Sequence, residues 1–128
     1  MEALTAAELL ARQGWGADAI SRAYYAILHA AKAALLVHEV AAESHSAVRR
    51  LVGVHLVQTG ALEREWAAIL AHSLDDRLSA DYDVEVSFSR AEASEECRRA
   101  RKFLKRIRDY LISHGFKATD LRMKKANS

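Results

Sequence analysis

The segment from Ser89 to Ile112 reads SRAEASEECRRARKFLKRIRDYLI and indicates the fold class more firmly than any other part of the sequence. Ser89 is followed three residues later by Glu92, which is the capping-box pattern of a helix start. Small and apolar side chains then recur at alternating spacings of four and three, which is the spacing of one helical face. These positions are Ala93, Cys97, Ala100, Leu104, Ile107 and Leu111. The segment therefore predicts a long helix that packs along its whole length, with Gly115 at its end.

Four more helices are expected upstream of this segment. A short first helix over residues 5–13 is predicted to start at Thr5 as N-cap, with Glu8 as the capping-box partner. The others are expected over residues 17–41, 45–58 (with Ser44 as N-cap) and 62–80. The longest run of one-face spacing lies in the second helix, at Ile20, Ala23, Tyr24, Ile27, Ala31, Ala34 and Leu35. Residues 81–88 are expected to form a loop.

Composition supports the same reading. The 128 residues include no proline and only five glycines, and 51% are hydrophobic and 28% charged. Because proline and glycine are the residues that interrupt helices, such a chain favours long helices in one core. We expect an all-α, antiparallel up-and-down bundle of four longer helices plus a short N-terminal one. It should occupy residues 1–114, with residues 115–128 as a frayed basic tail.

Several classes of protein are disfavoured by the sequence. The single cysteine, Cys97, cannot form an internal disulfide. No basic leader or apolar run of about 18 residues is present, so we expect a cytoplasmic protein without a membrane contact. The chain lacks a Gly-rich phosphate loop, a His-Glu-x-x-His motif and any Glu-x-x-His pair. We therefore expect no metal site and no cofactor.

Charge is distributed unevenly. Residues 1–97 hold 8 Lys or Arg and 15 Asp or Glu, whereas residues 98–128 hold 11 and 2. A basic C-terminal segment could hold a polyanion, an acidic partner or a second copy of the chain. The alternative is a solvated helix face whose positive charge suits a helix C-terminus.

A few polar residues stand on helix faces that should be apolar. Arg77 projects from the stripe that contains Trp66, and a buried arginine needs a partner because it cannot lose its charge. That partner could be Asp81 or Asp76 in an internal ion pair, or it could be a phosphate or a dimer partner. On the other helices, the side chains that could form a binding edge are Ser21, Tyr25, His29, His45 and His55. For each of these five, a polar edge of the core is the alternative interpretation.

Three stretches together resemble a known family in order and spacing. They are residues 19–33 (AISRAYYAILHAAKA), residues 44–60 (SHSAVRRLVGVHLVQTG) and residues 77–82 (RLSADY). They resemble the small, stand-alone HEPN proteins, the higher eukaryotes and prokaryotes nucleotide-binding domain. The resemblance covers residues 17 to about 112. It implies an antiparallel helical bundle that forms a homodimer, often a toxin encoded beside a minimal nucleotidyltransferase antitoxin.

The resemblance also implies an activity. Many HEPN proteins are metal-independent ribonucleases whose motif is an arginine followed after four to six residues by a histidine. Arg77 would be that arginine, and Tyr82 stands where the first possible histidine would be. With an ordinary pKa near 10, a tyrosine is a poor base at neutral pH. One hypothesis is therefore a toxin-like ribonuclease in which Arg77, Asp81 and Tyr82 form the catalytic cluster and a histidine elsewhere supplies the base.

Two rival hypotheses remain at this point. The first is a non-catalytic HEPN subunit that binds a nucleotide or a nucleotidyltransferase, which could modify the Tyr82 hydroxyl. The second is a purely structural bundle in which Arg77 and Asp81 form a buried pair.

Overall fold

The computed structural model describes residues 2–82 and 88–116, without the side chains at 2, 3 and 79–82. All described regular structure is helical, so the expected all-α class is confirmed. The helices are α1 (Glu2–Arg12), α2 (Gly16–Leu36), α3 (His45–Val52), α4 (Arg64–Tyr82) and α5 (Arg90–Ser113), and α3 continues directly into a π-helix, η1 (Gly53–Val57). No helix in the described part of the chain is both long and apolar enough to cross a lipid bilayer.

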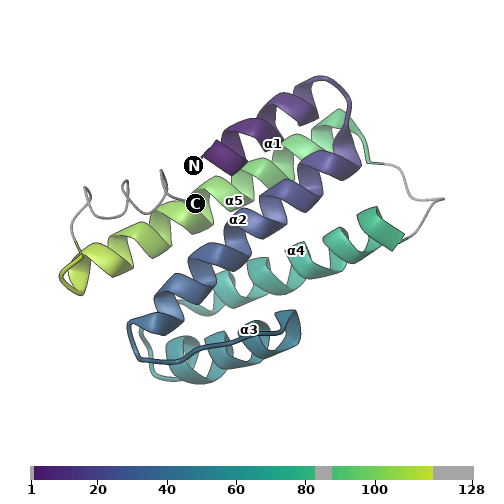
Figure 1. The fold of residues 1–128 in the computed structure, drawn as a ribbon. Coiled ribbons are helices and arrows are strands. Elements are labelled where there is room, and N and C mark those ends of the chain that lie inside the picture. The colour runs from purple at the N-terminus through teal and green to yellow at the C-terminus, as the bar shows by residue number, and fades with distance from the viewer. Residues whose placement is uncertain (1, 83–87, 117–128) are drawn as a thin grey trace.

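The four bundle helices, α1, α2, α4 and α5, alternate in direction (Figure 1), so the short additional helix is α3 and not the N-terminal helix as predicted. Figure 1 shows α1 and α2 running antiparallel, α4 returning along α2, and α5 running back beside α1 and α2. The short α3 lies across the lower end of the bundle, next to α4. α2 is the central element, because it packs against each of the other four α-helices.

The core forms where the apolar spacing predicts it. All seven predicted inward positions of α2 are buried, and so are Val48, Val52 and Leu56 in the third helical region. On α5, Phe103 and Tyr110 are buried beside the predicted seam, because they lie one residue before Leu104 and Leu111 on the same broad face. Cys97 is a core residue, and burial raises the pKa of its thiol to about 11.

The predicted start of the first helix was wrong. α1 already begins at Glu2, so Thr5 lies within the helix instead of capping it. The reason is Leu4, which is completely buried and therefore belongs to the packed face of the helix. Glu8, the predicted capping-box partner, forms an ion pair with Arg101 of α5.

α2 ends five residues before its predicted end, at Leu36 rather than at residue 41. Glu39 has a φ of 59°, and its N–H donates to the carbonyl of Leu36. The N–H of Val40 donates to the carbonyl of Leu35, which completes a Schellman motif. This motif usually has glycine at its left-handed position, so a glutamate there gave no sequence signal.

The remaining boundaries were partly right. Ser44 caps α3 as expected, by accepting a hydrogen bond from the N–H of Ala47, but residues 53–57 form a π-helix instead of continuing the α-helix. α4 spans residues 64–82 rather than 62–80, so Asp81 and Tyr82 are helical and not part of a loop. The Ser89–Glu92 capping box starts α5 as predicted, and Gly115 follows its end with a φ of 93°. The predicted basic tail from residue 117 lies outside the described residues.

Candidate functional site

Arg77 reaches from α4 to the adjacent face of α2. Its Nη2 donates a hydrogen bond to the Tyr25 hydroxyl oxygen at 2.8 Å. The guanidinium carbon also lies 5.3 Å from the ring centroid of Tyr25 and 5.9 Å from that of Tyr24. A guanidinium at this distance from an aromatic ring is attracted by the ring quadrupole. The half-buried Arg77 is therefore held in part by two phenol rings, which the sequence did not suggest as its partners.

Two histidines surround the same tyrosine. The His45 ring, at the start of α3, lies edge-on to Tyr24 and Tyr25, with centroid separations of 5.5 and 6.5 Å. The His29 ring lies one turn after Tyr25 on α2 and stacks on it at 6.5 Å. We call Tyr24, Tyr25, His29, His45 and Arg77 the Arg77 cluster. It joins three helices that are separate in the sequence.

The cluster changes the acid–base behaviour of two of its members. Burial lowers the pKa of His45 below 6.5, and the positive charges of Arg77 and Lys32 lower it further. The pKa of Tyr24 is raised above 10 by burial, against the lowering effect of Arg77. At neutral pH, His45 is therefore a neutral imidazole that can accept a proton, and Tyr24 keeps its own.

Two members of the Arg77 cluster are open to solvent. Tyr25 keeps 39% of its surface exposed, and His29 is also exposed. The cluster thus offers a guanidinium and a neutral imidazole beside an accessible aromatic ring. A guanidinium binds phosphate, imidazoles move protons near neutral pH, and an exposed aromatic ring stacks on a nucleic-acid base.

The other predicted site residues lie next to the Arg77 cluster, away from it, or outside the described side chains. Ser21 is half-buried on α2, one turn before Tyr25. His55 lies in η1, and no hydrogen bond or ring contact joins its side chain to the Arg77 cluster within residues 2–82 and 88–116. Asp81 and Tyr82 belong to the last turn of α4, but their side chains lie outside the described residues. Asp76, one expected partner of Arg77, pairs with His72.

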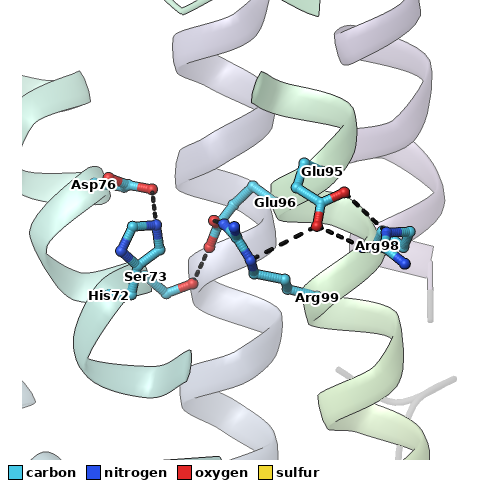
Figure 2. Close-up of polar contacts among 7 residues, drawn as sticks. All are labelled: His72, Ser73, Asp76, Glu95, Glu96, Arg98 and Arg99. Atoms are coloured by element: carbon cyan, nitrogen blue, oxygen red, sulfur yellow. Dashed lines mark hydrogen bonds and ion pairs between the residues drawn. The ribbon is translucent and has the colours of Figure 1, made fainter. Parts of the chain in front are cut away.

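A second polar cluster lies between α4 and α5 and was not predicted. Its centre is Glu96, which is only 1% exposed and accepts a hydrogen bond from the completely buried Ser73 hydroxyl. Arg99 Nη1 lies 3.2 Å from the other Glu96 oxygen. Figure 2 shows His72 and Asp76 beside this pair, joined at 3.1 Å between Nε2 and Oδ2. We call His72, Ser73, Asp76, Glu96 and Arg99 the Glu96 cluster.

The Glu96 cluster brings two carboxylates together. Burial raises the pKa of Asp76 above 3.8, and the neighbouring Glu96 raises it further, while the His72 imidazole opposes the rise. A signal for this cluster did exist in the sequence. Glu96 lies three residues after Ala93 and four before Ala100, so it occupies the packed face of α5.

Half of the eight basic residues of α5 form ion pairs within the chain. Four arginines form ion pairs with carboxylates: Arg98 with Glu95, Arg99 with Glu96, Arg101 with Glu8, and Arg106 with Glu63. Two of these pairs connect α5 to other segments, so part of the basic character of α5 serves packing. The last turn of α5 contains no basic residue, so the positive charge of this helix does not complement its C-terminus as the solvated-face interpretation supposed.

Comparison with known proteins gives consistent results. The family model described as HEPN domain matches residues 1–111. Two Methanocaldococcus jannaschii proteins, each named "Putative toxin", are 34% and 30% identical over 110 and 112 residues, covering 86% and 88% of this chain and 81% and 76% of theirs. A UPF0332 protein of Pyrococcus horikoshii is 46% identical over 76 residues, which are 59% of this chain and only 54% of that protein.

Proposed function

Because this chain belongs to the HEPN domain family, we propose that it is a toxin-like endoribonuclease that cleaves RNA without a metal ion. The observation that carries the proposal is the Arg77 cluster, in which Arg77 donates to Tyr25 at 2.8 Å and the His45 and His29 rings lie against that tyrosine. The "Putative toxin" names of two relatives agree with it.

The chemistry requires a base, an acid and a positive charge. In the proposed reaction, neutral His45 takes the proton of the ribose 2′-hydroxyl, and the 2′-oxygen attacks the adjacent phosphorus. The bond from phosphorus to the 5′-oxygen breaks, and His29 donates a proton to that leaving oxygen. The products are a 2′,3′-cyclic phosphate and a 5′-hydroxyl, so protons and bonds balance.

Arg77 has the electrostatic role in this scheme. Its guanidinium would stabilise the negative charge that builds on the phosphorane oxygens in the transition state. The Tyr25 ring would stack on a base next to the cleaved bond, since it is exposed and held by Arg77. Asp81 and Tyr82, one turn after Arg77 on α4, would complete the polar cluster. Ser21, one turn before Tyr25, would line its edge.

A second copy of the chain belongs to the proposal. One Arg77 cluster is open to solvent, and exposed Tyr25 and Leu78 flank Arg77 on α2 and α4. Covering this face with the same face of a second copy would bring two clusters into one cleft and bury these apolar groups. We propose such a homodimer, acting in the cytoplasm and held inactive by a minimal nucleotidyltransferase partner.

The test is RNA cleavage in EDTA. Purified wild-type protein should cleave a mixed RNA pool, whereas Arg77→Ala should be at least about 100-fold slower, as for loss of an electrostatic group in other enzymes. Arg108→Ala, which removes an exposed arginine from α5, is the matched control and should cleave like the wild type. Intact RNA with folded wild-type protein would reject the ribonuclease.

One observation favours a second candidate function. The three positions where the family motif could place its histidine hold Tyr82, Asp83 and Val84, so the motif histidine is absent. The alternative is a non-catalytic HEPN subunit that binds a nucleotide, stacked on Tyr25 and held by Arg77, or that docks a nucleotidyltransferase. It predicts saturable binding of ATP that is weakened by both Arg77→Ala and Tyr25→Ala, together with intact RNA.

A further inference from the structure

Three side chains that are common metal ligands meet between α4 and α5, in the Glu96 cluster. They are His72, Asp76 and Glu96, and their ligand atoms all lie within 4.8 Å of one another. His72 and Asp76 are four residues apart on α4, so one helix face presents both, and Glu96 comes from the facing helix (Figure 2). Helical bundles build metal sites in this way, from side chains on facing helices.

We propose that His72, Asp76 and Glu96 bind a divalent transition-metal ion, with Zn²⁺ as the best fit. One imidazole and two carboxylates are a ligand set that suits Zn²⁺, whereas Mg²⁺ prefers oxygen ligands only. This inference goes beyond the proposed ribonuclease, whose chemistry uses no metal, and it does not depend on that activity.

The geometry of the three ligands favours a shared ion. Ligand atoms bound to one tetrahedral Zn²⁺ at about 2.0–2.1 Å are about 3.3 Å apart. The His72 Nε2 and Asp76 Oδ2 atoms are already 3.1 Å apart. The buried Ser73 hydroxyl donates to one Glu96 oxygen and so orients its carboxylate, as groups behind metal ligands typically do.

The charges at this place also favour a cation. The carboxylates of Asp76 and Glu96 lie close together, and Glu96 is almost fully buried. Burying negative charge is costly unless a positive charge compensates it. Arg99 contacts Glu96 and supplies one positive charge. Arg99 also lies 3.9 Å from Glu95, so it can stay paired if a metal ion takes its place on Glu96.

The site is accessible from solvent. The His72 side chain is 53% exposed, and it borders a surface hollow of about 190 Å³ lined by Ala68, Ile69, His72 and Arg99. A water molecule in this hollow could complete a four-coordinate ion, with the three side chains as the protein ligands. Because the ligands come from both helices, the ion would hold α4 and α5 together. One of its ligands, Asp76, directly precedes Arg77 in the sequence.

The test is direct binding of Zn²⁺ to the full chain. EDTA-treated, desalted protein is titrated with ZnCl₂ by calorimetry, and its melting temperature is recorded with and without Zn²⁺. We expect one equivalent to bind and to raise the melting temperature, because a ligand specific for the folded state stabilises it. His72→Ala and Asp76→Asn should weaken binding by at least about tenfold and remove the temperature shift.

Two variants serve as controls. Glu95→Gln changes a neighbouring carboxylate outside the ligand set, and His38→Ala removes a histidine elsewhere; both should bind Zn²⁺ like the wild type. Arg77→Ala should also bind normally, which separates this test from the ribonuclease test. Absence of wild-type binding, or equal binding by the His72→Ala and Asp76→Asn variants, would overturn the site and leave the proposed RNA cleavage unaffected.

Discussion

α4 contributes to two polar clusters that differ in almost every respect. Towards α2 it presents Arg77, which lies against two phenol rings next to an exposed tyrosine face. Towards α5 it presents His72, Ser73 and Asp76, which meet a carboxylate that is 1% exposed. The first cluster has an exposed aromatic ring beside a cation, while the second is centred on a buried carboxylate that joins two helices and has the exposed His72 at its edge. One helix thus carries two clusters of opposite chemical character.

Among the variants that test the difference between the two clusters, the largest loss of RNA cleavage is expected for His45→Ala. If His45 is the base, His45→Ala should slow RNA cleavage by about 10²–10⁴-fold, the usual contribution of a general base. His55→Ala is the matched control, because His55 is half-buried nearby in sequence but has no contact with the Arg77 cluster among the described residues. The measurement is the initial rate on a fixed RNA substrate, and equal losses in both variants would assign the effect to folding.

The pH dependence of the same reaction gives an independent check on His45. Burial, Arg77 and Lys32 lower its pKa below 6.5, so His45 stays a neutral base to a lower pH than an ordinary histidine. The rate should therefore fall on the acid side with a midpoint below pH 6.5. Lys32→Gln should move that midpoint upward, because it removes one of the charges that disfavour protonation. A midpoint above 6.5 would contradict the role of His45.

The next effect in size is expected from Arg77→Lys. The substitution keeps the charge but loses the planar, forked donor set that donates to the Tyr25 hydroxyl and would, in the proposed reaction, also hold a phosphate. We expect cleavage to fall by about 10²-fold, at the lower end of the loss of a transition-state donor. The free energy of unfolding should change by less than about 1 kcal/mol, because lysine can keep part of the cation–π contact of the half-buried Arg77. Urea denaturation of the same samples measures the second quantity.

In the Glu96 cluster, substitutions are expected to lower the stability of the fold and to leave RNA cleavage unchanged. Glu96→Ala should lower the free energy of unfolding by about 1–3 kcal/mol, because the buried Ser73 hydroxyl loses its partner. Glu95→Ala, on the exposed side of the same turn, should change it by less than about 1 kcal/mol. RNA cleavage by the folded fraction of either variant should match the wild type. Equal stability of the two variants would show that burial of Glu96 gives it no special role.

The smallest effect concerns an ion pair outside both clusters. The hydrogen bond from Arg106, helped by Trp66, lowers the pKa of Glu63 from 4.5 to about 2. A carboxyl group with a lowered pKa stabilises the fold above pH 4.5, and this contribution is lost as the pH falls towards 2. It should be small, because the Glu63 side chain is 53% exposed. Urea denaturation of wild type and Arg106→Ala should give stability curves that differ above pH 4.5 and converge towards pH 2.

The sequence predicted the helices better than the contacts between them. Periodic apolar spacing identified the packed faces of α2 and α5, because burial depends on which side of a helix a residue occupies. The end of α2 was missed because Glu39 adopts a left-handed conformation that is typical of glycine. Such an end is set by tertiary packing and leaves no residue pattern to find.

The candidate site was predicted in its members but not in its geometry. Tyr25, His29, His45 and Arg77 were each identified, yet spacing along the chain could not show that three helices bring them together. Tyr24 was assigned only to the core, although its ring also contacts Arg77. The Glu96 cluster was missed because its residues come from two helices, so no fixed spacing along the chain marks them.

The π-helix after α3 bears on how this chain tolerates changes in its length. Its wider turn accommodates one more residue than an α-helical turn would. It follows the buried Val52 and includes the buried Leu56. Deletion of the exposed Val54 would return this region to ordinary α-helical geometry while leaving His45 and α3 unchanged. Residues 53–57 are therefore a place where the chain can gain or lose one residue between α3 and α4. Such a change would leave the position of His45, on the side of α3 near Arg77, unaltered.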